Sequence, residues 1–152
     1  MLESEERKSQ PFDAGYRGYI AGVLDCDGSI FITKETIAKR KHPHYTLRIS
    51  VSNTRSGLPQ WFADQFGGSV SRYKKGSDKW KPEWRWACTN TLAADVLRCC
   101  LPYLVIKHLQ GLLGLEFATT VSPHGKHLPQ SFRDIRTRIY GEMGALNKRG
   151  PA

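Results

Sequence analysis

The chain has 152 residues, of which 39% are apolar and 24% charged, and this composition fits one soluble globular domain of ordinary size. Its net charge of +9 favours a polyanionic partner, nucleic acid before an acidic membrane surface. A membrane-spanning protein is excluded, since no apolar run reaches the roughly 18 residues that a span requires.

The first predicted elements are a disordered lead and a helix that is rich in small residues. Residues 1–12 are polar and mixed in charge, which predicts disorder and argues against a signal peptide. Asp13 is placed to cap a helix over residues 14–24, in which Gly18 and Gly22 share one face. Because glycine inside a helix costs about 1 kcal/mol relative to alanine, these positions predict the close approach of another backbone.

Alternating apolar and polar residues then predict two β-hairpins with a helix between them. Residues 29–35 and 44–53 form the first hairpin, and residues 69–76 and 83–89 form the second. A helix over 58–66 is stopped by Gly67 and Gly68, and helices over 91–101, 107–119 and 131–147 follow. The predicted fold class is α+β, with the order α-β-β-α-β-β-α, appended helices, and one apolar sheet face for the helices.

The other face of the predicted sheet is polar and basic. A twisted β-ribbon of this kind fits the major groove of DNA, where arginine reads guanine edges and lysines and hydroxyls hold phosphates. The alternative is a solvated sheet face, but such faces normally mix lysine with glutamate, and few acids stand here. Which residues of 69–75 face the groove stays open. The predicted DNA-binding residues are Thr33, His44, Thr46, Arg48, Ser50, Arg72, Tyr73, Lys74, Lys75 and Arg85, with Lys39, Arg40 and Lys41 at a hairpin tip.

Two acids, Asp25 and Asp27, stand one residue apart at the end of the first predicted helix, directly before Gly28. A calcium loop is excluded because residues 29–34 supply no further oxygen ligands at regular spacing. A simple helix cap is unfavourable, since acids at a helix C-terminus oppose the macrodipole. A bound cation would offset that cost, so the two acids predict a divalent-metal site.

The stretch IAGVLDCDGS, Ile20 to Ser29, resembles the signature of the LAGLIDADG homing endonucleases position by position, with Cys26 as the largest departure. Residues 46–53, 66–70, 101–107 and 143–149 resemble further parts of the single-motif, homodimeric branch. The resemblance implies a curved antiparallel sheet with helices on one face. It also implies one endonuclease domain over residues 13–149, followed by a tail over residues 150–152.

The resemblance further implies roles for residues around the motif. Asp27 would coordinate a divalent metal together with the backbone carbonyl of Cys26, and Asn53 would lie near a metal-bound water. Lys107 falls at the position of a catalytic lysine, and Arg55 is the candidate for a peripheral basic residue. The implied cofactor is Mg²⁺, with Mn²⁺ as a substitute and Ca²⁺ binding without supporting cleavage.

The implied function is site-specific hydrolysis of double-stranded DNA by a homodimer, on a long and partly palindromic target, leaving short 3′ overhangs. The two copies are expected to pack at Gly18, Ala21, Gly22 and Asp25, of which Asp25 is otherwise structural. The alternatives are a non-catalytic intron-RNA maturase of the same fold and an unrelated basic RNA-binding α+β protein. Four cysteines without CxxC spacing predict reduced thiols and an intracellular protein, in an organelle (chloroplast or mitochondrion) or in prokaryotic cytoplasm.

Overall fold

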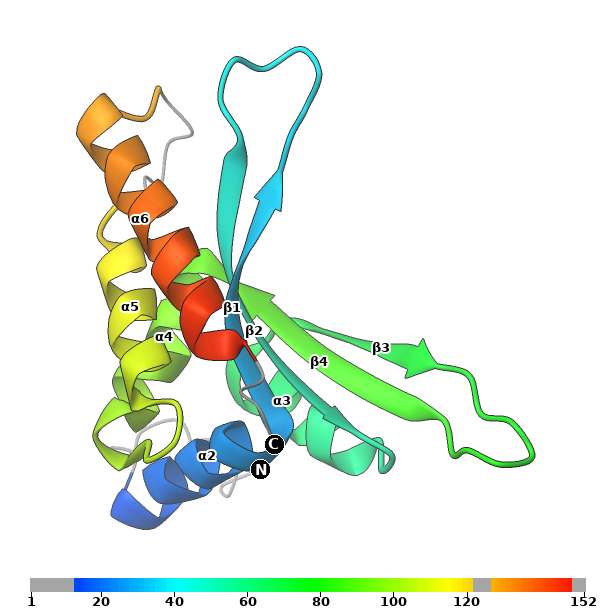
Figure 1. Cartoon of the computed structure of the whole chain (residues 1–152). Coiled ribbons are helices and arrows are strands. Elements are labelled where there is room, and N and C mark those ends of the chain that lie inside the picture. Colours follow the sequence, from blue (N-terminus) through cyan, green and yellow to red (C-terminus); the bar gives the residue numbers. More distant parts are fainter. Residues whose placement is uncertain (1–12, 122–126, 149–152) are drawn as a thin grey trace.

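The computed structural model describes residues 13–121 and 127–148, along which helices are interspersed with two β-hairpins (Figure 1). This order confirms the predicted α+β class. The predictions for residues 1–12 and 150–152 lie outside the described residues. In chain order the elements are α2 (Ala14–Asp27), β1 (Gly28–Glu35), β2 (His44–Asn53), α3 (Gly57–Phe66), β3 (Ser69–Lys74), β4 (Glu83–Thr89), α4 (Asn90–Cys100), the 3-10 helix η1 (Leu101–Tyr103), α5 (His108–Ala118) and α6 (Gln130–Asn147).

The strands form one antiparallel sheet in the order β1-β2-β4-β3. The second strands of the two hairpins, β2 and β4, therefore pair with each other at the centre of the sheet. They pair from Arg48 opposite Thr89 to Asn53 opposite Trp84, which is the second part of β2 and nearly all of β4. The outer part of each hairpin extends beyond this shared centre as a two-stranded arm.

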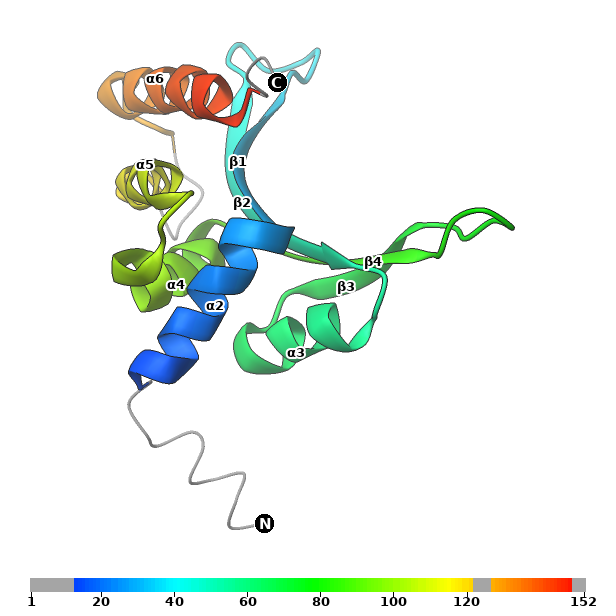
Figure 2. The same ribbon diagram turned by 60° about the horizontal axis from the view of Figure 1, so that its bottom comes forward.

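Helices lie on one side of this bent sheet only. Figure 1 shows the β1–β2 and β3–β4 hairpins diverging from the centre of the sheet. Figure 2 shows α4, α5 and α6 beside the first hairpin and α3 beside the second, all on the same side. No described helix covers the opposite, concave side, which we call the open face.

The helix-covered face of the sheet packs into the hydrophobic core, as the alternation of apolar and polar residues in β2 predicts. Tyr45, Leu47, Ile49 and Val51 are all buried, and they pack with side chains from the helices. Trp86 of β4 is fully buried and donates its indole N–H to the carbonyl of Gly67 at 2.7 Å. Burying this apolar face against the helices supplies the main stabilisation of the fold.

Short polar and glycine signals set several helix ends, and the largest difference from the prediction is at the end of α2, since the other helix ends differ by at most one residue. Asp13 accepts a hydrogen bond from the N–H of Tyr16 at 2.7 Å, which confirms the predicted N-cap. Gly67 and Gly68 have φ angles of 80° and 88°, so the predicted stop after α3 is confirmed in the left-handed region that glycine favours. Helix α2 continues to Asp27 instead of ending at Leu24, so both acids lie in its last turn.

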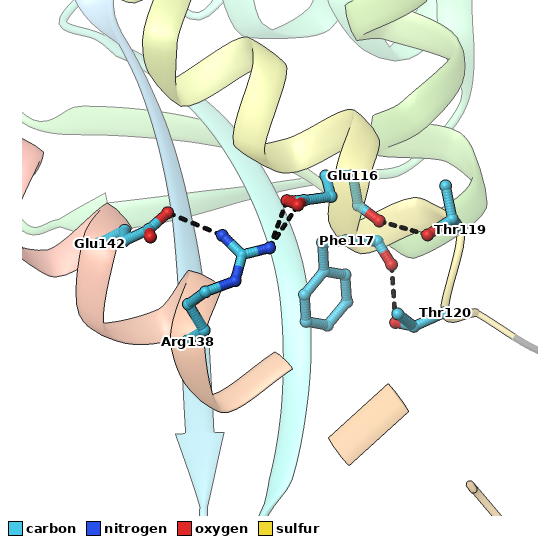
Figure 3. A network of polar contacts seen from close by, with 6 residues as sticks. All are labelled: Glu116, Phe117, Thr119, Thr120, Arg138 and Glu142. Carbon is cyan, nitrogen blue, oxygen red and sulfur yellow. Dashed lines mark hydrogen bonds and ion pairs between the residues drawn. The ribbon is translucent and has the colours of Figure 1, made fainter. Parts of the chain in front are cut away.

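An arginine on α6 connects this helix to α5. Arg138 donates hydrogen bonds to Glu116 of α5 and to Glu142 one turn along α6 (Figure 3). The Thr120 hydroxyl closes the end of α5 by donating to the carbonyl of Phe117 at 2.7 Å (Figure 3). Of these contacts, the pair between Arg138 and Glu116 joins α5 to α6.

Candidate active site and DNA-binding face

The first acid of the motif, Asp25, receives three consecutive backbone N–H groups from a segment 80 residues further along the chain. Its carboxylate accepts from Val105 at 2.9 Å, from Ile106 at 3.1 Å and from Lys107 at 3.0 Å. Successive N–H groups that converge in this way form a concave site for an anion. Asp25 therefore joins the end of α2 to the start of α5, a geometry that fits the structural role predicted for it.

The ammonium of Lys107 lies at the same helix end, where its Nζ donates to the backbone carbonyl of Asp25 at 2.5 Å. A cation at a helix C-terminus is favourable because it meets the negative end of the macrodipole. This lysine and the three N–H groups offset the cost of placing acids in the last turn of α2. The contact agrees with a capping role for Lys107, so its catalytic role stays a prediction.

The second acid, Asp27, is exposed where α2 passes directly into β1. Its Oδ2 accepts a hydrogen bond from the side-chain amide of Asn53 at 3.1 Å, and the Oδ1 of Asn53 accepts from the backbone N–H of Arg55 at 2.8 Å. The turn needs Gly28, because a Cβ there would lie 2.6 Å from the Cα of Leu24. The predicted residues Asp27, Asn53 and Arg55 are thus joined in one chain of hydrogen bonds at the edge of the open face.

The side chains at this point fit a hard divalent cation. Mg²⁺ is commonly bound through one or two carboxylates and several waters, and Asp27 presents an exposed carboxylate supported by the Asn53 amide. No group of three or more His, Cys, Asp or Glu side chains that could hold a metal occurs within residues 13–121 and 127–148. One copy of the chain therefore offers one carboxylate, and Cys26 beside it is exposed.

The open face carries the polar residues of both hairpins in cross-strand rows. The register places Thr33 beside Thr46, and Ser52 beside Arg85. The Nε of Arg48 is buried and has no hydrogen-bond partner in the described part of the chain. Ser50 shares this face but is only 4% exposed, so its hydroxyl is poorly placed to reach DNA as predicted.

The side chain of Arg85 is held in place on this face before any ligand binds. Its Nε donates to the hydroxyl of Ser52 at 3.0 Å, and its guanidinium stacks over the ring of Tyr73 at 3.4 Å from the centroid. Lys74 lies over the same ring at 5.4 Å and pairs with Glu83 at 3.3 Å. A guanidinium fixed in this way loses less conformational entropy when it contacts a base edge.

A β-bulge settles which side chains of β3 share a face with Arg85. Ser71 lies opposite Arg85 and Arg72 lies opposite Trp84, and the pairing shifts between Arg72 and Lys74. Directly paired residues share a face, so Arg72 lies on the helix-covered side of the sheet, and its predicted place on the DNA-binding face is corrected. The extra residue brings Tyr73 to the side of Arg85.

The remaining predicted DNA-binding residues lie at the outer ends of the two hairpins. Lys39, Arg40 and Lys41 are exposed at the turn of the first hairpin, followed by His44 at the start of β2. Lys75 is exposed directly after β3. The structure thus distributes positive charge along the length of both arms.

One side of α2 is bare, and it differs in part from the predicted set of interface residues. A Cβ built on Gly18 or Gly22 meets nothing within 4 Å, so this side of the helix is uncovered. Ala21 is fully buried in the core of its own chain, which removes it from the predicted interface. The sequence analysis missed Val105 and Ile106, which are 82% and 69% exposed. No local signal in the sequence identifies these apolar residues as exposed.

The sequence matches no family model, and it matches no curated protein, but the fold matches solved structures. The homing endonuclease I-CvuI, crystallised with a DNA target and Mg, shares 19% identity, with a TM-score of 0.74 over 90% of this chain and 84% of that chain. The archaeal intron-encoded homing endonuclease I-Vdi141I in complex with DNA shares 16% identity, with a TM-score of 0.72 over 89% and 86%.

A third similar structure is larger. The LAGLIDADG homing endonuclease I-SmaMI bound to cleaved DNA shares 15% identity, with a TM-score of 0.65 over 87% of this chain and 45% of that chain. The protein therefore has the fold of the LAGLIDADG homing endonucleases, which confirms at the level of fold the resemblance of residues 20–29. No described helix is long and apolar enough to cross a lipid bilayer.

Proposed function

We propose that the protein is a site-specific DNA endonuclease of the LAGLIDADG type that cuts both strands as a homodimer. The observation that carries the proposal is the position of Asp27. Its exposed carboxylate stands at the end of the motif helix α2, where β1 and the basic open face begin. An acid that could hold a metal thus borders the surface that would hold the DNA, in a chain whose fold is found in homing endonucleases bound to DNA.

A homodimer is supported because a single chain has only one of the two cleavage centres that a double-strand cut requires. Two strands require two cuts, and the chain has one copy of the DxDG motif. The bare side of α2 at Gly18 and Gly22 would let a second α2 approach closely around a two-fold axis. Exposed Val105 and Ile106 adjoin the same helix end and would gain apolar contacts there. The match to less than half of I-SmaMI agrees with a unit that works in pairs.

The open face would bind the DNA and determine its register. The curved shape of the sheet suits a β-ribbon in the major groove, with Arg48 and Arg85 as the candidates for base contacts. Lysines at the hairpin tips would contact phosphates and position the protein without reading sequence. Because Arg85 is already fixed by Ser52 and Tyr73, we expect its contact to be the more selective of the two arginines.

At the cleavage centre, Asp27 would hold Mg²⁺, with the backbone carbonyl of Cys26 and a carboxylate from the second copy as further oxygen ligands. Mn²⁺ would substitute, and Ca²⁺ would bind without supporting cleavage. When bound, the metal would lower the pKa of a water and stabilise the leaving oxygen. The Asn53 amide, bonded to Asp27, would orient the carboxylate and the attacking water. The Lys107 ammonium at the same helix end would stabilise negative charge on the phosphate.

Cleavage of a plasmid library that carries randomised target sites, with and without Mg²⁺, tests this function. We expect Mg²⁺-dependent linear products from a small set of sites, and no products from Asp27→Asn. Lys107→Ala should lower the cleavage rate far more than DNA affinity, whereas equal losses would leave it a capping residue. A cutting-competent Asp27→Asn protein would remove the proposed metal centre.

The alternative of a non-catalytic intron-RNA maturase is favoured by none of the similar structures. We also propose a reducing compartment, an organelle or prokaryotic cytoplasm, because Cys26, Cys88, Cys99 and Cys100 are all unpaired.

A further inference from the structure

A second basic site lies on the side of the β1–β2 hairpin that carries the helices. A cavity of about 1160 Å³ opens between residues 40–45 of this hairpin and residues 127–137 around the start of α6. We call it the arm cleft. It lies beside Tyr45, whose side chain belongs to the core side of the sheet, so it is distinct from the open face.

Positive groups dominate the lining of the arm cleft. It contains one acid, Asp134, which accepts a hydrogen bond from Gln130 at 2.8 Å. Three histidines add ring nitrogens that can donate to an anion. The cations that line the cleft are Arg40, Lys41, Arg133 and Arg136, and the histidines are His42, His44 and His127.

Among the described residues these cations have no acidic partner, in contrast to Arg138, a neighbour of Arg133 and Arg136 on α6. Arg138 of α6 is neutralised by Glu116 and Glu142 (Figure 3). Within the described residues, no salt bridge joins Arg133 or Arg136 to any carboxylate. Arg136 is only 9% exposed, and two of its nitrogens donate to Thr120 at 2.8 and 2.9 Å. Its guanidinium also lies over the ring of Phe117, 4.9 Å from the centroid, so among the described residues its contacts are a threonine and an aromatic ring rather than a carboxylate.

The volume of the arm cleft indicates which kind of polyanion could fit in it. Its volume slightly exceeds that of typical small-molecule pockets, which hold roughly 300–1,000 Å³. A duplex needs a groove-sized, open surface, and the open face already provides one. A few linked nucleotides of a single strand match both the volume and the arrangement of several cations along one wall, which is how single strands are commonly bound.

We infer that the arm cleft binds a single-stranded nucleic-acid segment through its phosphates, at a site that shares only Arg40, Lys41 and His44 at the hairpin end with the DNA-binding face. Arg133, Arg136 and His127 on one wall and Lys41 on the other would contact successive phosphates. This binding does not depend on DNA cleavage, so it can be tested whether or not the protein is an endonuclease.

The test measures fluorescence anisotropy of the full chain with labelled oligouridylate and oligothymidylate of about ten nucleotides, a length within the range that single-strand sites occupy. A labelled duplex of random sequence is measured in parallel. Arg133→Glu and His127→Glu should each weaken single-strand binding about tenfold at low salt and change duplex binding less than about twofold. Asp134→Lys should tighten single-strand binding.

Matched controls on α4 separate a local effect from a change in net charge. Arg98 and Asp95 are exposed and pair with each other at 3.0 Å, away from the cleft. Arg98→Glu and Asp95→Lys should change single-strand binding less than about twofold at moderate salt, where distant charges are screened. A preference for the RNA or the DNA oligomer would identify the source of the strand, and either supports the cleft.

Two results would overturn the inference. One is that the cleft variants weaken single-strand and duplex binding in parallel, or no more than Arg98→Glu does. The other is that neither oligomer binds more tightly than about 10⁻⁴ M at low salt, the weak end of non-specific binding. Because His127 is exposed and on no helix, its variant keeps the test valid if Arg133→Glu is poorly folded.

Discussion

Replacing Asp25 by asparagine should destabilise the protein, although the two side chains have nearly the same shape. The carboxylate accepts three backbone N–H groups, from Val105, Ile106 and Lys107. An asparagine keeps one carbonyl oxygen and turns an NH₂ group toward the remaining donors. At least one N–H then loses its acceptor, and the others lose a charged one.

The magnitude follows from these contacts. Hydrogen bonds to charged groups contribute about 1.5–3 kcal/mol, and an unsatisfied buried donor costs about 1–3 kcal/mol. Val105 and Ile106 are exposed, so water can replace part of the loss. We therefore expect the free energy of unfolding to fall by about 2–3 kcal/mol, which lowers Tm by roughly 4–12 °C in a chain of this size.

The matched control is Asp27→Asn, two residues along the same helix. Asp27 is exposed and accepts one hydrogen bond, from Asn53. Its replacement should change stability by less than about 1 kcal/mol while it abolishes cleavage. Thermal and urea unfolding of both variants, alongside DNA binding in Ca²⁺, measure the difference. Equal stability of the two variants would refute the structural role of Asp25.

Three further predictions concern the dimer, the DNA-binding face and the buried thiols. Gly22→Leu should fill the bare side of α2 and shift light scattering toward the monomer, since nothing in its own chain opposes the larger side chain; an unchanged dimer would place the interface elsewhere. Arg85→Ala should cost about 1–3 kcal/mol and relax specificity at a few bases in a binding-site selection, whereas Arg72→Ala on the other face should not; equal effects would contradict the register. Burial raises the pKa of the Cys88 thiol from 9.0 to about 12, so the folded state keeps a proton that the unfolded chain releases in this range. Stability should therefore fall as pH rises above about 9, and Cys88→Ala should show a smaller fall in thermal melts between about pH 8 and pH 10; an identical slope would argue against this burial.

Local patterns in the sequence predict most of the elements. The alternation of residues 44–53 specifies a strand with one dry face, because side chains of a strand point to opposite sides in turn. Gly67 and Gly68 stop a helix because the left-handed backbone is open to them without a Cβ clash. These properties depend on neighbours within a few residues, and the sequence displays them directly.

The sequence predicted which residues form the site, but it did not predict the hydrogen bonds that connect them to distant segments. The spacing of Asp25, Asp27 and Gly28 indicates a special helix end. The resemblance already implies different roles for the two acids, but the contacts that hold Asp25 are visible only in the structure, where the loop at Val105 to Lys107 reaches it from 80 residues away. Local sequence patterns extend over a few residues, so they carry no information about which distant loops come into contact.

The sequence by itself determined the order of helices and strands, the polar face of the sheet and the motif that ends α2, since each rests on local backbone preference and residue spacing. Only the tertiary structure decided that Ala21 is enclosed in its own core and that a bulge turns Tyr73 rather than Arg72 toward Arg85. It also decided that basic residues of the hairpin and of α6 line one cleft. Each of these results depends on how distant elements pack, and packing is settled by the joint burial of many side chains at once.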